Sequence, residues 1–370
     1  MVTALPPHPE APTAAARRPD LLGLSRSRLA ELLAPIVDRP FRAGQVYDAL
    51  NRRGVGDFAA MTELSKELRR RLGERFSIGL PEVAERLVSA DETVKVLLRL
   101  GDGAVIEAVD IPDRGRHTLC ISSQAGCALA CSFCVTGYWG AGRNLTAGEI
   151  VGQVLAVRRD RDLPEGLNLV FMGMGEPLLN TANLAAALEI LTETIALRRI
   201  TVSTSGIVPG IEEMARWERR PNLAISLHSP DDERRSRIMP INRTYPLADL
   251  LACLRRYPLE ANRRLTFEYI LIRDLNDARA DADALARLIA PFRAKVNLIP
   301  VNPDPVLGAR MVPPSAERID AFHRRLKERG VLSTVRRCRG DDVSAACGQL
   351  RAPHRLPRGF ARRTGVRPHP

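Results

Sequence analysis

From His117 onward the sequence alternates apolar, β-branched runs with stretches of helical apolar spacing. The expected strands are HTLCISS, LNLVFMG, ITVSTS, LAISLH, LTFEYILI and VNLIPV, and helical stretches such as EIVGQVLAVRR, NLAAALEILTETI and DADALARLIAPF lie between them. Thr146-Ala-Gly-Glu149 opens the first of these helices as a capping box. Strands that alternate with helices pair in parallel, because a parallel connection needs a crossover. The sequence therefore predicts an α/β fold with a parallel sheet, open or closed.

The residues before this alternation differ in character. Residues 1–20 are rich in Pro and Ala and lack an apolar signal-peptide core, which predicts a disordered lead. Residues 21–90 contain helical spacing in LSRSRLAELLAPI, RAGQVYDALNRRG and ELSKELRRRLGERF, and are predicted to form a helical accessory domain. The Arg-rich faces of these helices are either ordinary solvated surface or an RNA-docking surface.

Two β-rich runs flank the turn Gly101-Asp102-Gly103, so residues 91–116 are predicted to be a β-hairpin connection. The α/β region then spans residues 117–350. The remaining residues 351–370 carry six arginines and no acidic residue, and are predicted to form a basic, disordered tail.

Composition limits the classes of function without deciding between them. The chain has 55 Lys and Arg against 43 Asp and Glu, a net charge of +12 that favours a polyanionic partner. About half of this excess lies in the tail, so charge alone leaves nucleic-acid binding open. No apolar stretch approaches the roughly 20 residues that span a bilayer, and no membrane partner is expected. Seven cysteines, three of them in one loop, favour a reducing cytoplasm over a disulfide framework.

Three cysteines, Cys127, Cys131 and Cys134, follow the first predicted strand with spacings of three and two residues. Thiolates favour zinc, copper(I) or an iron–sulfur cluster. Cysteines hold a cubane cluster at its irons, and three of them leave one iron open to a small molecule. The alternative is a zinc site with a fourth ligand from elsewhere. Zinc sites usually pair two knuckles, and the sequence has neither a second cysteine pair nor a His-x3-5-His pair.

Four polar segments follow the ends of predicted strands. They are Gly173-Met-Gly-Glu176-Pro177, Ser203-Thr-Ser205-Gly206, Ser226-Leu-His228-Ser229 and Pro300-Val-Asn302-Pro303. Each alone is consistent with a turn or helix cap, but in β/α barrels this rim carries the active site. Glu176 suits an ammonium group, and Ser203, Ser226 and Asn302 supply hydrogen-bonding groups, with His228 beside them. A small zwitterion that carries a sugar and a base would suit this rim.

The cysteine spacing after the first strand, with Gly-Glu-Pro after the second, resembles the radical S-adenosylmethionine (SAM) superfamily. Further motifs are similar to those of the RNA adenine methyltransferases of the RlmN/Cfr family, from the helical N-terminal region to Leu350. They are Arg339-Gly-Asp-Asp-Val-Ser-Ala-Ala-Cys347-Gly-Gln-Leu, Asn-Leu-Ile-Pro-Val-Asn302-Pro and Ser226-Leu-His228. The resemblance implies a partial, TIM-like β/α radical SAM barrel with a small N-terminal helical accessory domain that binds RNA.

The resemblance also implies roles for individual residues. Cys127, Cys131 and Cys134 would hold a [4Fe-4S] cluster, whose open iron SAM chelates through its amino and carboxylate groups. The implied SAM pocket consists of Gly175, Glu176, Ser203, Ser226, Leu227, His228 and Asn302. The implied catalytic residues are Cys347, Cys120 and Glu107, the last as a proton acceptor.

The implied reaction methylates carbon 2 of adenosine, which is too electron-poor to attack the SAM methyl group, so a radical route is needed. In the family's scheme Cys347 takes a methyl group from one SAM, and a second SAM, reductively cleaved, yields a radical that removes hydrogen from that group. The carbon adds to the base. After deprotonation, attack by Cys120 on the Cys347 sulfur releases methyladenine and leaves a disulfide.

The implied substrates are 23S rRNA at the peptidyl transferase centre and adenosine 37 of tRNAs. A Cfr-type enzyme, which methylates carbon 8 of the rRNA adenosine, is the close alternative. A non-catalytic, zinc-containing RNA-binding protein is the alternative from another class. We further expect an electron donor such as flavodoxin, a monomeric state and a cytoplasmic location.

Several cysteines also have simpler explanations. Cys120 lies in an apolar run, where a cysteine is usually a small buried hydrophobe, and Cys253 is expected in the core. Cys338 is either an incidental thiol or a participant in the disulfide chemistry. The aromatic pair Tyr138-Trp139 is expected to pack rather than to stack on a base.

Overall fold

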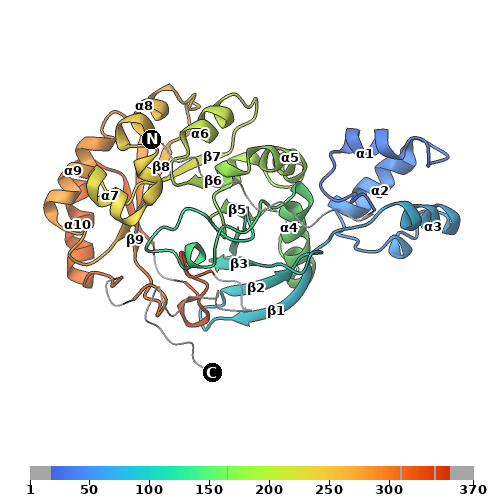
Figure 1. The fold of residues 1–370 in the computed structure, drawn as a ribbon, viewed down its shortest axis with the longest axis horizontal. Coiled ribbons are helices and arrows are strands. Elements are labelled where there is room, and N and C mark those ends of the chain that lie inside the picture. The colour runs from blue at the N-terminus through green and yellow to red at the C-terminus, as the bar shows by residue number, and fades with distance from the viewer. Residues whose placement is uncertain (1–17, 165, 309–310, 337–338, 351–370) are drawn as a thin grey trace.

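The structure is a computed structural model that describes residues 18–164, 166–308, 311–336 and 339–350 (Figure 1). Most of the predicted lead, Cys338 and the predicted basic tail lie outside the described residues.

A single sheet of ten strands organises the molecule, and its strands lie side by side in chain order. The strands are β1 (Glu82–Val88), β2 (Val94–Arg99), β3 (Val105–Asp113), β4 (Arg116–Cys120), β5 (Asn168–Phe171), β6 (Ile200–Thr204), β7 (Asn222–Ser226), β8 (Leu265–Leu271), β9 (Ala294–Pro300) and β10 (Ser333–Val335). Strands β1 to β4 pair antiparallel, and β4 to β10 pair parallel. In the described pairings β1 and β10 are the two edges, so the barrel is partial, as predicted.

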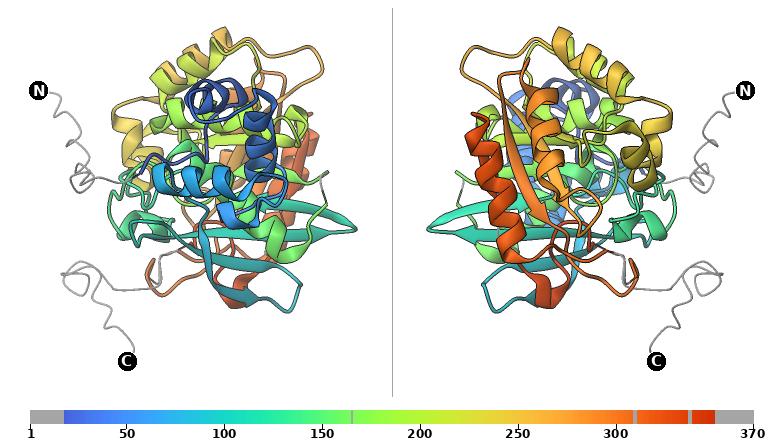
Figure 2. Two further views of the ribbon diagram at one scale, coloured as in Figure 1. Left: turned by 90° about the vertical axis from the view of Figure 1, so that its right-hand side faces the viewer. Right: turned by 90° about the vertical axis from the view of Figure 1, so that its left-hand side faces the viewer.

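Helices cover the outer face of the parallel strands (Figures 1 and 2). Every residue of β8 is buried, which explains its continuous apolar sequence. The covering helices are α4 (Ala147–Arg161), α5 (Thr181–Leu191), α6 (Val208–Ala215), α7 (Asp232–Ile238), α8 (Leu247–Arg256), α9 (Arg279–Ile289) and α10 (Ala316–Glu328). Each crossover returns the chain to the same edge of the sheet, so the strand ends that carry the predicted site residues meet there.

Three helices precede the sheet: α1 (Arg26–Leu33), α2 (Phe41–Asn51) and α3 (Lys66–Arg75). They face the viewer in the left panel of Figure 2 and adjoin α4 and α5. The range 21–90, described above as helical, is wrong in its last part, because β1 lies inside it and joins the sheet. Strand β1 could not be predicted from the sequence, because its seven residues are mostly exposed and lack apolar alternation.

The N-terminal helices pack tightly on the barrel. Their buried residues belong to the same continuous hydrophobic core as those of the sheet. Tyr47 donates a hydrogen bond to Glu193 at 2.7 Å. Gly23 lies so close to α4 that a Cβ atom there would stand 2.1 Å from the nitrogen of Gly148. The N-terminal helices and the barrel therefore pack as one unit.

None of the described helices is both long and apolar enough to cross a bilayer.

The capping box predicted at the start of α4 is present. Glu149 N donates to the Thr146 hydroxyl at 3.1 Å, and Thr146 N donates to the Glu149 carboxylate at 2.9 Å. We expect Thr146→Ala to lower the free energy of unfolding by about 1 kcal/mol, because the helix loses an N-terminal acceptor. In thermal unfolding this corresponds to a midpoint lower by about 2 °C. Thr146→Ser, which keeps the hydroxyl, should match the unmodified protein, and an equally large loss for Ser would contradict the capping role.

Candidate active site

The cysteine loop joins β4 to α4 and is held by close backbone contacts. Gly126 adopts φ +130°, and a Cβ atom there would stand 2.7 Å from the Gly140 oxygen. Cys127 N donates to the same oxygen at 2.9 Å. At Gly142 a Cβ atom would stand 1.8 Å from the oxygen of Ala125. The three cysteines, which are partly exposed as whole residues, therefore lie on a loop whose shape is set by its glycines.

The three thiols of this loop lie close enough to influence one another. Burial raises the pKa of the Cys127 thiol to about 12, and it also raises the pKa of Cys131 and of Cys134. The negative charges of neighbouring thiolates and of Glu176 raise the pKa of Cys127 and Cys131 further. Burial thus favours the neutral thiols in the metal-free protein, and binding of a metal would convert them to thiolates.

The donor set fits an iron–sulfur cluster better than a single zinc ion. Among the described residues no three His, Cys, Asp or Glu side chains converge on a point where one ion could sit. Zinc requires such convergence, with sulfur about 2.3 Å from the ion. A cubane spreads its cysteine ligands over different irons, so three neighbouring but separated thiols suit it.

Glu176 follows β5 and lies beside the cysteine loop. Its side chain is buried, and one carboxylate oxygen accepts hydrogen bonds from Ser205 N and Oγ, both at 2.8 Å, while the other accepts from Leu178 N at 3.0 Å. Burial raises the pKa of Glu176. Gly175 has φ +94° and packs so tightly that a Cβ atom would stand 2.4 Å from Gln124 Cβ. These contacts aim the carboxylate from a rigid turn.

The segment after β7 positions main-chain groups rather than an acid or base. Leu227 is fully buried, and its N–H donates to the main-chain oxygen of Glu268 at 3.0 Å. His228 adopts φ +59° and its Nδ1 accepts from Ile270 N at 3.1 Å. Burial and the charge of Arg235 lower the pKa of His228 to about 3, so the ring is neutral at pH 7.

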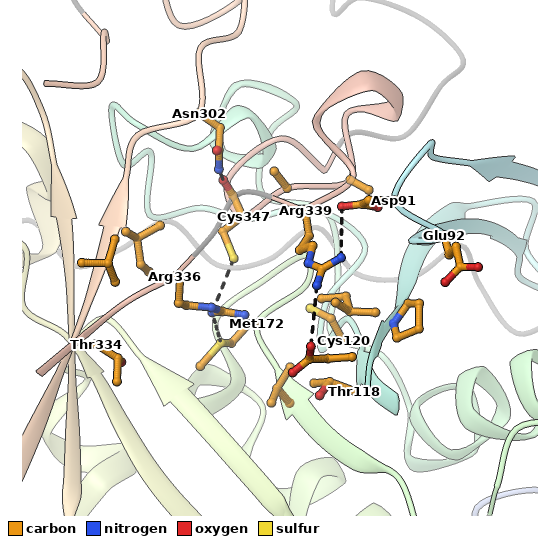
Figure 3. Close-up of a pocket in the computed structure, with 18 of the residues that line it drawn as sticks. Asp91, Glu92, Thr118, Cys120, Met172, Asn302, Thr334, Arg336, Arg339 and Cys347 are labelled. Atoms are coloured by element: carbon orange, nitrogen blue, oxygen red, sulfur yellow. Dashed lines mark hydrogen bonds and ion pairs between the residues drawn. The ribbon is translucent and has the colours of Figure 1, made fainter. Parts of the chain in front are cut away.

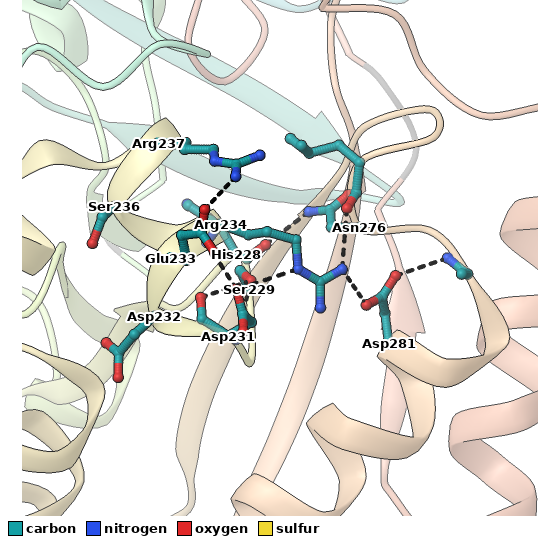
Figure 4. Close-up of polar contacts among 12 residues, drawn as sticks. His228, Ser229, Asp231, Asp232, Glu233, Arg234, Ser236, Arg237, Asn276 and Asp281 are labelled. Carbon is teal, nitrogen blue, oxygen red and sulfur yellow. Dashed lines mark hydrogen bonds and ion pairs between the residues drawn. The ribbon is translucent and has the colours of Figure 1, made fainter.

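A polar network fixes this segment from outside (Figure 4). Asn276 donates to the His228 carbonyl at 2.7 Å, and Arg234 of α7 bonds to Asp281 of α9 at 2.5 Å. The His228 ring also meets Phe133 of the cysteine loop edge-on, with centroids 4.7 Å apart.

Cys120 and Cys347 line one cavity of about 1100 Å³ (Figure 3). Cys120 ends β4, and Cys347 lies in the segment after β10. The Arg336 guanidinium lies between two sulfur atoms, with Nη1 3.8 Å from the Cys347 sulfur and 3.7 Å from the Met172 sulfur. Asn302 also lines the cavity and donates to the Cys347 carbonyl at 3.0 Å. Both cysteines are free thiols in the structure.

Residues 339–350, which carry Cys347, are held across the open side of the sheet. The Asp342 carboxylate accepts from Ser89 Oγ at 2.6 Å and from Ala90 N at 3.1 Å, both in the β1–β2 turn. At the other end Val135 N donates to the Gly348 oxygen at 2.6 Å. This segment is thus fixed both to the antiparallel hairpin and to the cysteine loop.

Glu107 lies on β3 and points to the same face of the sheet as Cys120, because Val109, two residues along, is directly opposite Cys120. It is buried and does not line the cavity; Lys95 Nζ lies 3.5 Å from its carboxylate. Lys95 also donates to the Ser344 oxygen at 3.2 Å, which links Glu107 to the segment that carries Cys347.

Two serines of the predicted rim lie on strands in the structure: Ser203 is on β6, and Ser226 ends β7. Four residues of the site were not predicted from the sequence: Ser205, Lys95, Arg235 and Arg336. Ser205 belongs to the motif Ser203-Thr-Ser205-Gly206, whereas the three charged residues resemble ordinary surface positions in sequence. Cys253 is buried on α8, as expected, and Tyr138 and Trp139 pack against Val135, Val306 and Leu307.

Comparison with known proteins places the chain in a family. Residues 121–289 match the model of the radical SAM superfamily, and residues 19–78 match that of the ribosomal RNA large subunit methyltransferase N-terminal domain. The dual-specificity RNA methyltransferase RlmN of Anaeromyxobacter dehalogenans is 46% identical over 345 residues, covering 90% of this chain and 92% of the relative. The same enzyme of Geobacter sulfurreducens is 48% identical over 338 residues, with 90% and 92% coverage.

The chain belongs to the RlmN family of radical SAM RNA methyltransferases. The crystal structure of a radical SAM methyltransferase from Sphaerobacter thermophilus has a TM-score of 0.85 and 45% identity, covering 90% of this chain and all (100%) of that one. The predicted fold, the SAM-dependent RNA methyltransferase class and the cofactors, a [4Fe-4S] cluster and SAM, are confirmed for this RlmN relative. The non-catalytic zinc protein is thereby wrong.

Burial raises the pKa of the Cys120 thiol to about 12. In reduced, metal-free protein at pH 8 we expect iodoacetamide to modify Cys120 about a thousandfold more slowly than a short cysteine peptide, because only the thiolate reacts. The rate should rise about tenfold per pH unit between pH 8 and 10. Peptide mass spectrometry measures both rates, with Cys120→Ser to verify the assigned peptide. Modification at the peptide's rate would show that Cys120 is not enclosed.

Proposed function

We propose that the enzyme methylates carbon 2 of adenosine in 23S rRNA, at the peptidyl transferase centre, and adenosine 37 of tRNAs. The relatives named above are dual-specificity RNA methyltransferases, and they share 46–48% of residues over 90% of this chain. The observation that carries the proposal is the placement of Cys120 and Cys347, from opposite ends of the barrel sequence, in one cavity. Methyl transfer through one cysteine, with release by a second, requires two thiols that open into one cavity.

Cys347 is the proposed methyl carrier. Its sulfur takes the methyl group of one SAM and gives up its proton, and Arg336, at 3.8 Å, provides a positive partner for the thiolate that attacks. When bound, the cluster and a second SAM supply the radical chemistry that activates an unreactive carbon–hydrogen bond. The carbon carried by Cys347 bonds to the base, which gives up one electron and the proton of its own carbon. Cys120 then loses its proton and forms a bond to the Cys347 sulfur as the sulfur–carbon bond breaks, and the released carbon takes up a proton to become the methyl group. Two electrons from an external reductant restore both thiols.

Cys127, Cys131 and Cys134 are the proposed ligands of the cluster. The proposed SAM pocket is formed by Gly175, Glu176, Ser203, Ser226, Leu227, His228 and Asn302. The buried carboxylate of Glu176 suits the SAM ammonium group, and its hydrogen bonds from Ser205 hold it in place. Leu227 and His228 are suited to contribute main-chain groups, since one side chain is fully buried and the other is a neutral, internally bonded ring.

Glu107 is the proposed proton acceptor. The Lys95 ammonium group at 3.5 Å fixes its carboxylate on the face of the sheet that carries Cys120. Because Glu107 does not line the cavity, the proton would reach it through a small movement of the neighbouring segment or through a bridging water.

The substrate base must leave its stack to reach the enclosed thiols, which favours an accessible adenosine in a structured RNA loop. The Arg-rich helices α1 to α3 are the proposed contact with RNA phosphates, so binding should weaken with salt. Free thiols and an iron–sulfur cluster favour a reducing cytoplasm. An electron donor such as flavodoxin and a monomeric state complete the proposal.

The regiochemistry has a direct test. Anaerobic protein with a reconstituted cluster, SAM and a reductant should convert unmodified 23S rRNA to a product that contains 2-methyladenosine, measured by mass spectrometry of the digested RNA. Cys347→Ala should give none while still cleaving SAM, because it lacks the methyl carrier. If 8-methyladenosine forms instead, the enzyme is of the Cfr type. Full methylation by Cys347→Ala would contradict the carrier role.

Cys120→Ala should stall the reaction after the carbon–carbon bond to the base has formed. We expect a covalent protein–RNA adduct through Cys347, visible as a slower band on a denaturing gel and removed by nuclease. Cys253→Ala, a change at a buried thiol far along the chain on α8, serves as the matched control and should form none. Turnover of Cys120→Ala at the unmodified rate would leave Cys120 only a packing role.

A further inference from the structure

Arg235, on α7, is the largest fully buried side chain of the described structure, with an exposed fraction of 1%. Its guanidinium donates to three main-chain oxygens: Nε to Leu227 at 3.0 Å, and Nη2 to Ser205 at 2.7 Å and Ser226 at 3.0 Å. Nη1 donates to Asn242 Oδ1 at 2.5 Å. The accepting oxygens belong to the segments that end β6 and β7, so one side chain joins two strand ends of the proposed SAM pocket.

The charge of Arg235 has no carboxylate partner. No ion pair within 4.0 Å involves this guanidinium in the described part of the chain, and Asn242 is neutral. A buried and unpaired charge is costly, because it loses its hydration without a counter-charge. Arg235 lies close enough to Cys131 of the cysteine loop for the two side chains to interact electrostatically.

A second contact ties the same helix to the cysteine loop. The oxygen of Ile238, one turn after Arg235, accepts from Ser132 N at 2.9 Å. Ser132 follows Cys131 directly. Because α7 thus holds the loop at one residue and the rim at another, a shift of the helix would displace both together.

Ser205 connects Arg235 to the carboxylate of Glu176. Its main-chain oxygen accepts a hydrogen bond from Arg235, while its N–H and its hydroxyl donate to Glu176, both at 2.8 Å. Ser205 therefore joins a buried cation to a buried carboxylate. The carboxylate is the group proposed to meet the SAM ammonium.

We propose that Arg235 is a positioning residue of the cofactor site: its guanidinium holds the ends of β6 and β7 in the geometry that binds SAM, and its positive charge favours the reduced state of the cluster on the neighbouring cysteines. The first half rests on the proposed SAM pocket. The second half rests only on the cysteine ligands.

The electrostatic reasoning is direct. Reduction adds one negative charge to a cluster that already carries three thiolates. The reduction potential of such clusters depends on net charge, hydrogen bonding and solvent exposure. A fixed positive charge in a region of low dielectric constant stabilises the more negative state, so its removal makes the cluster harder to reduce.

Three variants separate the two roles. Arg235→Gln removes the charge, Arg235→Lys keeps the charge but cannot bond three oxygens on two strands, and Arg237→Gln removes an exposed arginine from the same helix as the control. In protein with a reconstituted cluster, the midpoint potential is measured by a redox titration followed by electron paramagnetic resonance. The dissociation constant of SAM is measured by equilibrium dialysis, and iron and sulfide content report cluster occupancy.

We expect Arg235→Gln to lower the midpoint potential and to weaken SAM binding about tenfold, as loss of these hydrogen bonds implies. Arg235→Lys should keep the potential close to the unmodified value but weaken SAM binding, and Arg237→Gln should change neither. An unchanged potential in Arg235→Gln with full iron content overturns the role of the charge. Unchanged SAM affinity in both Arg235 variants overturns the positioning role.

If the Arg235→Gln protein does not hold the cluster, the measurements on Arg235→Lys test both roles. A lowered potential in that variant overturns the role of the charge, and unmodified SAM affinity overturns the positioning role. Cys131→Ala separates these outcomes from a failure of the proposed site: if it retains the full iron and sulfide content, the ligand assignment is wrong whatever Arg235 does.

Discussion

The active site depends on how the segment 339–350 is fixed across the open side of the sheet. A partial barrel leaves its two edges apart, so Cys347 reaches Cys120 only because this segment is held on both sides. Asp342 binds Ser89 and Ala90 of the β1–β2 turn, and Asn302 at the end of β9 binds the Cys347 carbonyl. These hydrogen bonds join residues far apart in sequence, and they hold Cys347 at the cavity that Cys120 also lines.

The antiparallel strands β1 to β3 extend the sheet and also support the segment 339–350. They carry Lys95 and Glu107 on the same face as Cys120, and their first turn receives Asp342. Lys95 in turn bonds the Ser344 oxygen. A shorter sheet that began at β4 would retain the cluster loop and the SAM rim but would leave the segment that carries Cys347 without its second support. The proposed methyl transfer through Cys347 would therefore depend on this extension of the sheet.

Much of this arrangement could be predicted from the sequence. Buried parallel strands have continuous apolar runs, and polar residues at strand ends must meet at one edge, so Glu176, Ser226 and Asn302 could be assigned to a rim without coordinates. The capping box at Thr146 depends only on local spacing and was equally accessible. Strand β1 was missed because exposed edge strands carry charged residues and no apolar alternation.

The buried charges could not be predicted, for a physical reason. Helix α7 has the sequence DERRSRI, in which Arg234, Arg235 and Arg237 are alike in composition, and the exposed fractions of the first and last side chains are 32% and 62%. Which of them turns inward depends on the carbonyls of β6 and β7, which lie far from α7 until the barrel forms. A guanidinium is buried there because the interior offers it several oxygen acceptors. The main-chain oxygens that accept hydrogen bonds from Arg235 lie at the ends of the strands that form the rim. The same bonds therefore offset the cost of burying the charge and fix the geometry of the proposed cofactor site.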